Sequence, residues 1–324
     1  MSVRRIGVLT SGGDAPGMNA AVRAVVRTAM YHGIECYGIR RGYNGLITGD
    51  IMKLDEKSVS RIINRGGTIL YTARSKEFTT EEGQKKAVSV CKLLGLDSII
   101  AIGGDGTFRG AKALSKHGIN VIGIPATIDN DICCTNYSIG FDTAANTAID
   151  CIDKLRDTMQ SHERCSVVEV MGRNAGYLAM YVGLAVGATA VLVPEREMDF
   201  EKDVVEKIRQ ARLKGFTHYM IVLAEGAGKA THVAKLLKET IDLDARVTVL
   251  GHIQRGGAPS ARDRVNATKM GYLAVELLRA GKTNRIVCTN DGKFLDLDID
   301  EGLSQRRDMQ QMEVDVLTAM TGLK

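Results

Sequence analysis

Short apolar runs rich in β-branched residues alternate along the chain with segments whose apolar residues recur at helical spacing. RRIGVLT (residues 4–10) predicts a strand, and after a glycine turn MNAAVRAVVRTAMYHG (18–33) predicts a helix. The strand pattern recurs at residues 34–40, 97–107, 120–128, 165–173, 188–195, 217–226 and 245–257. Strands that alternate with helices form mainly parallel sheets covered on both faces, so we expect an α/β fold.

Residues of unusual chemistry stand just past these apolar runs. They are Thr10, Gly104, Asp129, Arg173, Glu225 and His252. Open parallel sheets bind ligands outside the carboxyl ends of their strands, so several of these residues are expected to face one cleft. The number of strands favours two sheets, and because the chain has no repeat or flexible linker, we expect domain boundaries in ordinary loops near residues 140 and 255.

Composition narrows the class of protein without naming a ligand. The 324 residues carry a net charge of +5 in scattered basic residues, which suits a small anionic ligand better than a nucleic acid, although a mildly basic solvated surface explains the charge equally well. Seven cysteines without a CxxC pair favour free thiols in a reducing cytoplasm. Residues 177–192 are too few and too rich in glycine to span a membrane, and no secretory leader opens the chain. We expect a cytoplasmic protein.

LTSGGDAPGMNAA (residues 9–21) joins a strand end to a helix start through a glycine pair. Gly12 and Gly13 let backbone N–H groups approach an anion closely, and the dipole of the following helix adds a favourable potential. Asp14 and Pro16 have a second interpretation, as a helix cap and a first-turn proline, which leaves the glycine pair unexplained. We expect a loop that contacts phosphate but is not a Walker A loop, because GxxxxGK[ST] is absent.

AIGGDGTFRGA (residues 101–111) surrounds Asp105 with glycines between a strand and a helix. A carboxylate there can hold Mg²⁺ against the phosphates of a nucleotide, and Thr107 offers a hydroxyl. A tight turn with a capping acid is the alternative. GGDGT also resembles the nucleotide loop of NAD kinases and diacylglycerol kinases, so by itself it indicates an ATP-using kinase without naming the acceptor.

IPATIDND (residues 124–131) places two carboxylates, Asp129 and Asp131, directly after a predicted strand. Phosphoryl transfer to a hydroxyl needs a carboxylate that takes the proton, and Asp129, which follows Thr127, is the better candidate. Asp131 could place metal-bound water or orient Asp129, or it could simply cap the next helix.

Cations stand at two further strand ends. Arg173 lies in EVMGRNAG (residues 169–176), and His252 and Arg255 lie in GHIQRGG (residues 251–257). The guanidinium fork matches a terminal phosphate and histidine can add a donor, whereas a single Arg or His is usually a surface residue or a satisfied core residue. Together these cations favour a phosphorylated acceptor.

The motifs together resemble the bacterial ATP-dependent 6-phosphofructokinases. The resemblance runs from IGVLTSGGDAPGMNAA through INRGGT, GGDGT, TIDND, SVVEVMGR and VLGHIQRGG, and it weakens after about residue 290. It implies a Rossmann-like fold of two domains, each a mainly parallel sheet flanked by helices. It also implies a larger ATP-binding domain of residues 1–139 and 255–304, and a smaller domain of residues 140–254 and 305–324 that binds fructose 6-phosphate.

The resemblance implies a role for each matching residue. Asp129 matches the base that takes the proton of the sugar's 1-hydroxyl, Arg173 also touches the transferring phosphoryl group, and Asp105 matches the Mg²⁺ ligand. The positions that match ATP contacts are Gly13, Arg74, Ser75, Gly104, Asp105, Gly106 and Thr107. The positions that match sugar-phosphate contacts are Thr127, Ile128, Asp129, Met171, Gly172, Arg173, Glu225, His252, Ile253, Gln254 and Arg255. Arg164 and Arg246 match arginines that reach the substrate from a neighbouring subunit, so the resemblance implies a homotetramer.

Two positions bear on the phosphoryl donor. The pyrophosphate-using relatives typically carry Asp in place of Gly106 and Lys in place of Ala126. A carboxylate at 106 would crowd and repel the region of the α-phosphate, whereas glycine leaves room. The chain is therefore predicted to use ATP.

The regulatory site of the family is matched only in part. Arg23, Arg27, Arg156 and Lys214 match cations that bind ADP or phosphoenolpyruvate between subunits. Glu56 and Thr189 stand where the pattern has Arg and Glu, and Phe216 and Thr217 stand where it has two lysines. Reversing the charge that faces a phosphate disfavours anions, so we expect weakened or altered effector control; the alternative is that Arg23 and Arg27 are a solvated helix face.

Two rival functions are open at this point. A kinase of NAD or of a lipid rests on GGDGT alone and leaves TIDND, MGR and HIQRGG unexplained. A catalytically silent nucleotide-binding regulator is disfavoured because each catalytic match is intact.

Overall fold

The computed structural model describes residues 3–321, which form two compact units. The first unit comprises the chain up to Thr127, Ile132–Thr143 and Arg255–Arg307. The second comprises Ile128–Asp131, Ala144–Gln254 and the chain from Asp308. The predicted domain limits, and the ligand expected in each domain, stay predictions.

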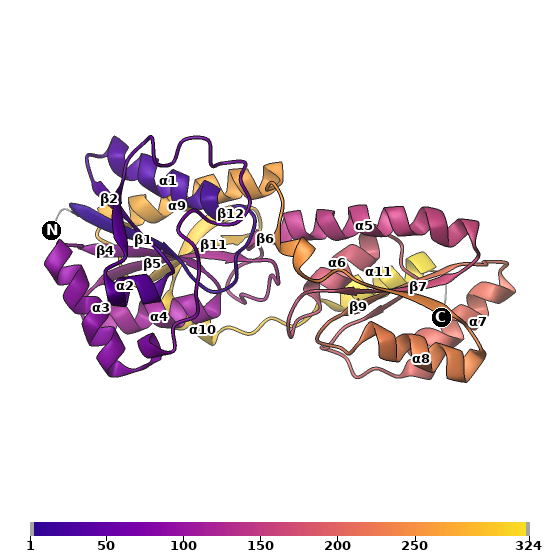
Figure 1. Cartoon of the computed structure of the whole chain (residues 1–324). Helices are drawn as coiled ribbons and strands as arrows, with labels where there is room; N and C mark the ends of the chain where they lie inside the picture. Colours follow the sequence, from indigo (N-terminus) through magenta and orange to yellow (C-terminus); the bar gives the residue numbers. More distant parts are fainter. Residues whose placement is uncertain (1–2, 322–324) are drawn as a thin grey trace. The chain divides into compact units, whose positions relative to one another are not determined.

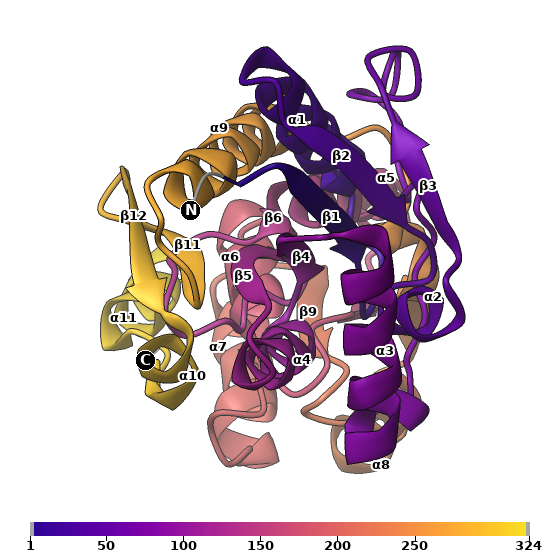
Figure 2. The same ribbon diagram turned by 90° about the vertical axis from the view of Figure 1, so that its left-hand side faces the viewer.

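The first unit is built on an eight-stranded sheet in the order β12-β11-β5-β4-β1-β2-β3, with β6 paired to β5 (Figures 1 and 2). Its neighbours pair in parallel except β3 and β12, which are antiparallel at the two edges. Central residues such as Val8, Ile100 and Ile122 stand side by side in register and are fully buried. The strands are β1 (Arg5–Thr10), β2 (Glu35–Ile39), β3 (Ile51–Leu54), β4 (Ser98–Gly103), β5 (Asn120–Thr127), β6 (Ile139–Gly140), β11 (Arg285–Asn290) and β12 (Lys293–Asp298).

Helices cover both faces of this sheet. The long helices α1 (Met18–Tyr31) and α9 (Ala261–Arg279) pack on each other and against one face, and α4 (Asp105–Lys116) packs on β4 and β5 from the other (Figure 2). With α4 lie the remaining elements of that layer, namely α2 (Tyr43–Thr48), the 3₁₀ turn η1 (Glu77–Thr79), α3 (Glu81–Leu94) and α10 (Ile299–Ser304).

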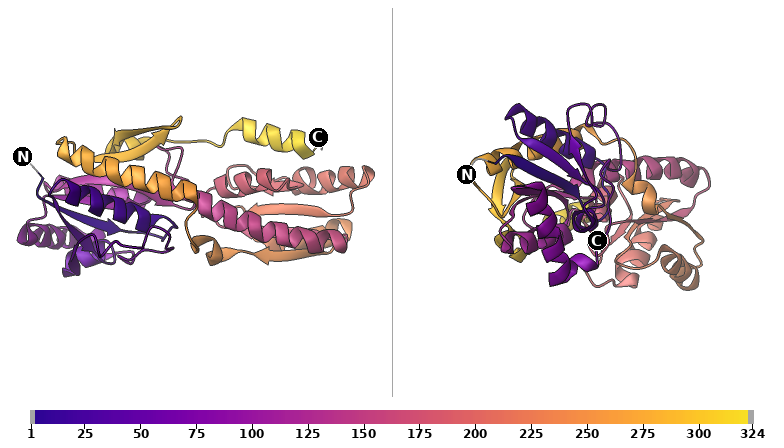
Figure 3. Two further views of the ribbon diagram at one scale, coloured as in Figure 1. Left: turned by 90° about the horizontal axis from the view of Figure 1, so that it is seen from above. Right: turned by 60° about the vertical axis from the view of Figure 1, so that its left-hand side comes forward.

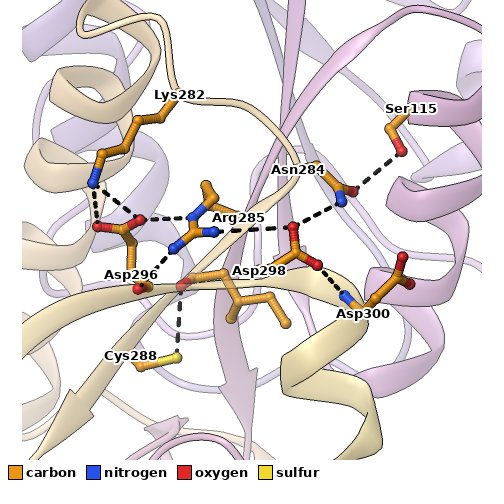
Figure 4. A network of polar contacts seen from close by, with 9 residues as sticks. Ser115, Lys282, Asn284, Arg285, Cys288, Asp296, Asp298 and Asp300 are labelled. Carbon is orange, nitrogen blue, oxygen red and sulfur yellow. Dashed lines mark hydrogen bonds and ion pairs between the residues drawn. The ribbon is translucent and has the colours of Figure 1, made fainter.

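A hairpin of β11 and β12 closes one edge of the sheet with a network of charges (Figure 4). Asp296 accepts hydrogen bonds from Lys282 Nζ at 2.9 Å and Arg285 Nε at 2.7 Å, and its side chain is 14% exposed. Partial burial opposes ionisation of Asp296, but the two cations outweigh it and hold the pKa of that carboxyl below its ordinary value. The network therefore fastens the antiparallel edge strand to the sheet.

The second unit contains a smaller parallel sheet in the order β10-β7-β9-β8. Its strands are β7 (Cys165–Val170), β8 (Ala190–Leu192), β9 (Tyr219–Ala224) and β10 (Ala245–Val249). Helix α8 (Ala230–Ile241), the π-turn η2 (Glu201–Val205) and α7 (Glu206–Leu213) share a core with these strands. Helices α5 (Phe141–Ser161), α6 (Tyr177–Ala185) and α11 (Gln311–Thr321) complete the layers, and α11 packs on α6 (Figure 3, left, yellow). The 3₁₀ turn η3 (Gly251–Arg255) follows β10.

These observations confirm the predicted α/β class with mainly parallel sheets, and they correct details. Helix α1 begins at Met18 after Gly17, which has left-handed φ of 106°, so Asp14 is not its cap. No helix follows Asp131 before Phe141, so the alternative that Asp131 caps the next helix is wrong. Strands β3, β6, β11 and β12 were not among the predicted strands.

The membrane and cysteine expectations can be compared with the described residues. No helix within residues 3–321 is long and apolar enough to cross a membrane. All seven cysteines are free thiols.

Candidate active site

In the first unit, the segments after β1 and β4 lie against each other at the carboxyl edge of the sheet. Ser11 N donates to Ile102 O at 3.0 Å, and Thr107 Oγ1 donates to Ser11 O at 3.1 Å. Gly103, the last residue of β4, permits this approach, because a Cβ there would lie 2.4 Å from Ser11 O and 2.3 Å from Thr107 Oγ1. The two glycine motifs of the sequence thus form one backbone-lined edge.

Asp105 is the first residue of helix α4, which begins at this edge of the sheet. The cap position of the helix is Gly104, and Asp105 is the first residue inside it. The alternative interpretation of Asp105 as a capping acid is therefore wrong. The Asp105 side chain is 42% exposed, and its Oδ2 lies 3.8 Å from Arg109 Nη2. A Cβ added at Gly104 or Gly106 would meet no atom within 4 Å. The carboxylate and the open glycines therefore leave room for an anionic ligand with a cation.

A loop between β3 and α3 borders the same edge. Thr10 Oγ1 donates to Tyr71 O at 2.8 Å and lies 2.9 Å from Thr68 Oγ1, and Thr72 Oγ1 donates to Gly12 O at 2.6 Å. Arg74 follows and is exposed, whereas Ser75 is half-buried and its Oγ accepts from Phe78 N at 3.2 Å. The structure therefore joins the segment that contains INRGGT to the loop that contains Gly12 and Gly13, called the glycine loop below. The sequence motifs did not predict this contact.

Arg255 also meets the glycine loop. Its Nη1 donates to Asp14 O at 3.2 Å, and a Cβ at Gly13 would lie 2.5 Å from the same nitrogen. A side chain at position 13 would therefore displace the Arg255 guanidinium from its present position. The sequence had placed these two residues in separate motifs.

Strand β5 carries the motif IPATIDND at its carboxyl end. Thr127 is the last residue of the strand and pairs with Gly140 of β6. The next residues turn sharply, since Asn130 has φ of 50°, and Asp129 is 7% exposed while Asp131 is half-buried. The Asp129 carboxylate is therefore largely shielded from solvent.

In the second unit, loops after three neighbouring strands meet at the carboxyl ends of the strands. Met171 N donates to Gln254 Oε1 at 2.9 Å, and Arg173 N donates to Glu225 Oε1 at 2.8 Å. Gly172 has φ of 141° and Arg173 has φ of 57°, so the chain turns tightly and leaves the Arg173 side chain exposed. Gln254 is fully buried, and its Nε2 has no hydrogen-bond partner among the described residues. These contacts group Met171, Gly172, Arg173, Glu225 and Gln254.

Arg164 and Arg246 lie at the other end of the same sheet. Arg164 precedes β7, and Arg246 is the second residue of β10, paired with Ser166. Both are exposed. A strand of six residues spans ~20 Å, so these arginines are remote from the group at Arg173 within their own unit. His252 and Ile253 lie in the turn after β10 and are exposed.

The residues expected at a regulatory site are spread over both units. On α1, Arg23 and the exposed Arg27 are neighbours, and burial followed by repulsion from Arg27 lowers the pKa of Arg23. In the second unit, a cavity of about 180 Å³ is lined by Arg156, Thr189, Phe216, His218 and Met320 among others. Lys214, Thr217 and Glu56 are exposed. The cavity wall thus combines one guanidinium with an aromatic ring and thioethers.

A family model described as phosphofructokinase matches residues 5–278. The chain belongs to the phosphofructokinase family. The match spans both motif groups, the glycine edge of the first unit and the loops of the second.

Individual phosphofructokinases agree with this assignment. The ATP-dependent 6-phosphofructokinase of Clostridium botulinum is 54% identical over 98% of this chain and 100% of its own length. The crystal structure of Pichia pastoris phosphofructokinase in the T-state superposes with a TM-score of 0.89 at 34% identity, over 99% of this chain, which spans 37% of that chain. A pyrophosphate-dependent phosphofructokinase from Marinobacter aquaeolei gives a TM-score of 0.86 at 22% identity, over 98% of this chain and 92% of that chain. The fold is therefore shared with a relative that is named as pyrophosphate-dependent, so the fold alone does not identify the phosphoryl donor.

Proposed function

We propose that this phosphofructokinase transfers the γ-phosphoryl group of ATP to the 1-hydroxyl of D-fructose 6-phosphate, giving fructose 1,6-bisphosphate and ADP in the committed step of glycolysis. The observation that carries the proposal is the similarity, over essentially its full length, to the ATP-dependent 6-phosphofructokinase of Clostridium botulinum. We also propose that the protein acts in the cytoplasm.

The reaction chemistry is assigned to the strand ends. Asp129 accepts the proton of the sugar's 1-hydroxyl as the oxygen attacks, and Thr127 and Asp131 hold the surrounding segment. Arg173 places its guanidinium against the charge that spreads over the transferring phosphoryl oxygens. The exposure of Arg173 beside a tight turn supports that role, because the side chain is available to a ligand.

The nucleotide is assigned to the glycine edge of the first unit. Gly13 and the segment Gly104–Thr107 contact its phosphates through backbone N–H groups, and Arg74 and Ser75 contact the rest. Magnesium fits Asp105, whose carboxylate is exposed at the start of a helix, and the ion supplies neutralisation of phosphate charge when bound. No group of three His, Cys, Asp or Glu within residues 3–321 could hold a metal, and an ion held by one carboxylate, water and phosphates does not require such a group.

The sugar phosphate is assigned to the group in the second unit. Arg173 and the turn at His252, Ile253 and Gln254 offer donors, with Arg255 beyond it, and Met171, Gly172 and Glu225 shape the loop. Gln254 supports this assignment through its Oε1, which accepts from Met171 N at 2.9 Å and so fixes the loop that carries Arg173. Ile128 follows Thr127 and is assigned to the same substrate.

ATP is proposed as the donor rather than pyrophosphate. Gly106 is exposed with open space around it, and Ala126 is 1% exposed within β5. An initial-velocity matrix of ATP and pyrophosphate against fructose 6-phosphate and other acceptors tests this assignment. Formation of ADP only with fructose 6-phosphate is expected, and activity with pyrophosphate but not ATP would overturn the donor. Activity on NAD or a lipid would favour the rival kinase.

We propose a homotetramer in which Arg164 and Arg246 complete a neighbouring subunit's site. Their place at the amino end of the small sheet supports this, because they cannot reach the Arg173 group of their own unit. Mixing inactive Asp129→Ser and Arg246→Ala subunits under dissociating conditions, then restoring native conditions, should recover part of the activity. Each variant carried through the same treatment alone is the control, and no recovery in the mixture would count against shared sites.

Effector control is proposed to be weak or altered. Arg23, Arg27, Arg156 and Lys214 would hold the effector anion, but Thr189 and Phe216 give the cavity wall little charge. Velocity against fructose 6-phosphate should change less than about twofold when ADP or phosphoenolpyruvate is added. Strong conventional responses would refute this proposal.

A further inference from the structure

Asp263 is a fully buried carboxylate in the first unit, outside the residues assigned to either substrate. Gly140 N donates to its Oδ1 at 2.7 Å and Thr143 N donates to its Oδ2 at 2.9 Å. The hydroxyls of Tyr137 and Thr143 donate one further bond to each of these oxygens. Burial raises the pKa of Asp263, and these four hydrogen bonds oppose that shift. Four hydrogen-bond donors on one carboxylate hold the side chain of Asp263 in a fixed orientation.

The local sequence predicts a different use for this side chain. Ser260 caps helix α9 and accepts from Asp263 N at 3.2 Å, and the spacing Ser-x-x-Asp is that of a capping box. In a capping box the acid would accept from the N–H of the capping serine. Here Ser260 N donates to Thr143 Oγ1 at 2.9 Å instead, and the carboxylate is directed to the segment 137–143. The Asp263 carboxylate therefore accepts hydrogen bonds from the segment 137–143 and not from the first turn of its own helix.

The segment that Asp263 holds lies against two candidate ligand-binding segments. Gly140 pairs with Thr127, the last residue of β5, from which the chain passes directly into residues 128–131. A Cβ at Gly140 would lie 2.6 Å from Ala15 Cβ, so β6 also touches the glycine loop. A Cβ at Gly17 would lie 2.6 Å from Ile139 Cγ2 and 3.5 Å from Asp263 Cβ. Movement of β6 would therefore shift both segments.

We propose that Asp263 is a positioning residue for phosphoryl transfer: by fixing β6 and the first turn of α5, it sets the end of β5 and the glycine loop in their reactive arrangement. The inference rests on the proposed function. It concerns the turnover number more than sugar-phosphate affinity, because Arg173, Glu225 and Gln254, which are assigned to the sugar phosphate, belong to the second unit, whereas Asp263 and the segment that it holds belong to the first.

Asp263→Asn is the decisive variant. Whichever way the amide turns, its NH₂ group faces two donors, so the backbone N–H of either Gly140 or Thr143 loses its acceptor. We expect kcat to fall about tenfold or more while KM for fructose 6-phosphate changes less than about threefold. Asp296→Asn is the matched control, since it also removes a charge that holds hydrogen bonds in the first unit but lies at the β11–β12 edge.

A second pair of variants keeps the test open if Asp263→Asn fails to fold. Thr143→Val removes the hydroxyl that bonds Asp263, whereas Thr143→Ser retains it. We expect Thr143→Val to lower kcat about threefold or more and Thr143→Ser to restore it.

The outcomes separate the inference from the function on which it rests. Loss of kcat in Asp263→Asn and Thr143→Val, with both Asp296→Asn and Thr143→Ser within twofold of the unaltered enzyme, supports positioning. An unchanged kcat, or equal losses in Asp296→Asn at a matched loss of Tm, overturns it. The unaltered enzyme without fructose 6-phosphate-dependent ADP formation would overturn the proposed function first, and the inference with it.

Discussion

The carboxyl edges of the two sheets are built from different materials. In the first unit the edge is mainly backbone, with glycines at 12, 13, 103, 104 and 106 and the carbonyl of Ser11 packed close to Gly103. In the second unit it is mainly side chains, with Gln254 and Glu225 each accepting a backbone N–H of the loop that carries Arg173. A backbone edge suits a ligand recognised through its phosphates, whereas side chains suit recognition of one particular sugar phosphate.

This difference implies different vulnerabilities. A backbone edge fails when a side chain is added, because close contacts to carbonyl oxygens cannot move away cheaply. A side-chain edge fails when a polar group is removed, because a loop N–H or a ligand oxygen loses its partner. Substitutions of opposite kinds should therefore inactivate the two regions.

The largest effect is expected from Asp129→Ser. Loss of the proton acceptor should lower kcat by about 10²–10⁴-fold and leave KM for fructose 6-phosphate nearly unchanged, since the sugar contacts stay. Coupled measurement of ADP formation checks both constants, with Asp153→Ser on the exposed face of α5 as control. A rate close to that of the unaltered enzyme would remove Asp129 from the role of base.

Two alanine substitutions distinguish a closely packed glycine of the first unit's carboxyl edge from a glycine with open space around it. Gly103→Ala should lower the free energy of unfolding by about 1–3 kcal/mol, because its Cβ would lie 2.4 Å from Ser11 O. Gly106→Ala has open space and should keep or slightly raise stability while raising KM for ATP several-fold, about threefold to tenfold. Thermal unfolding and ATP titrations separate the two effects, and equal stability of both variants would contradict the close packing.

The side-chain edge is tested at Glu225. Glu225→Ala removes the acceptor of Arg173 N, so KM for fructose 6-phosphate should rise about tenfold, whereas Glu225→Gln keeps an acceptor oxygen and should lose less. Steady-state kinetics at saturating ATP measure the difference. Identical behaviour of the two variants would mean that the charge of Glu225, and not its bond to the loop, matters for binding.

The smallest effect on activity should come from substituting Asp296, which lies on the edge strand β12 and is not among the residues assigned to a substrate. Since the folded pKa of Asp296 is lowered, its stabilisation is present above the ordinary value of 3.8 and is lost as the pH falls through the folded pKa. Asp296→Asn should therefore unfold about 1 kcal/mol more easily at pH 7, and this difference should shrink at a pH well below 3.8, with kcat unchanged at pH 7. Urea unfolding at both pH values tests the sign.

Much of the candidate site could be predicted because its residues occur in contiguous motifs at strand ends. Gly104 to Thr107 and Asp129 are of this kind, since a strand followed by glycine or a carboxylate is visible in the sequence. The bond from Arg255 to the carbonyl of Asp14 could not be predicted, because no local pattern links positions that distant. Asp263 was missed for the opposite reason, as its local pattern indicates a helix cap and thereby hides its tertiary role.

The sequence by itself determined the α/β class, the sites of most of the strands and the glycine and carboxylate motifs, because these depend on periodicity and on residues near one another in the chain. Tertiary structure decided strand order, the antiparallel edges of the larger sheet and the partners of buried polar groups such as Asp263 and Gln254. A buried polar group must find a partner wherever the fold brings one, and that choice depends on contacts between residues far apart in the chain.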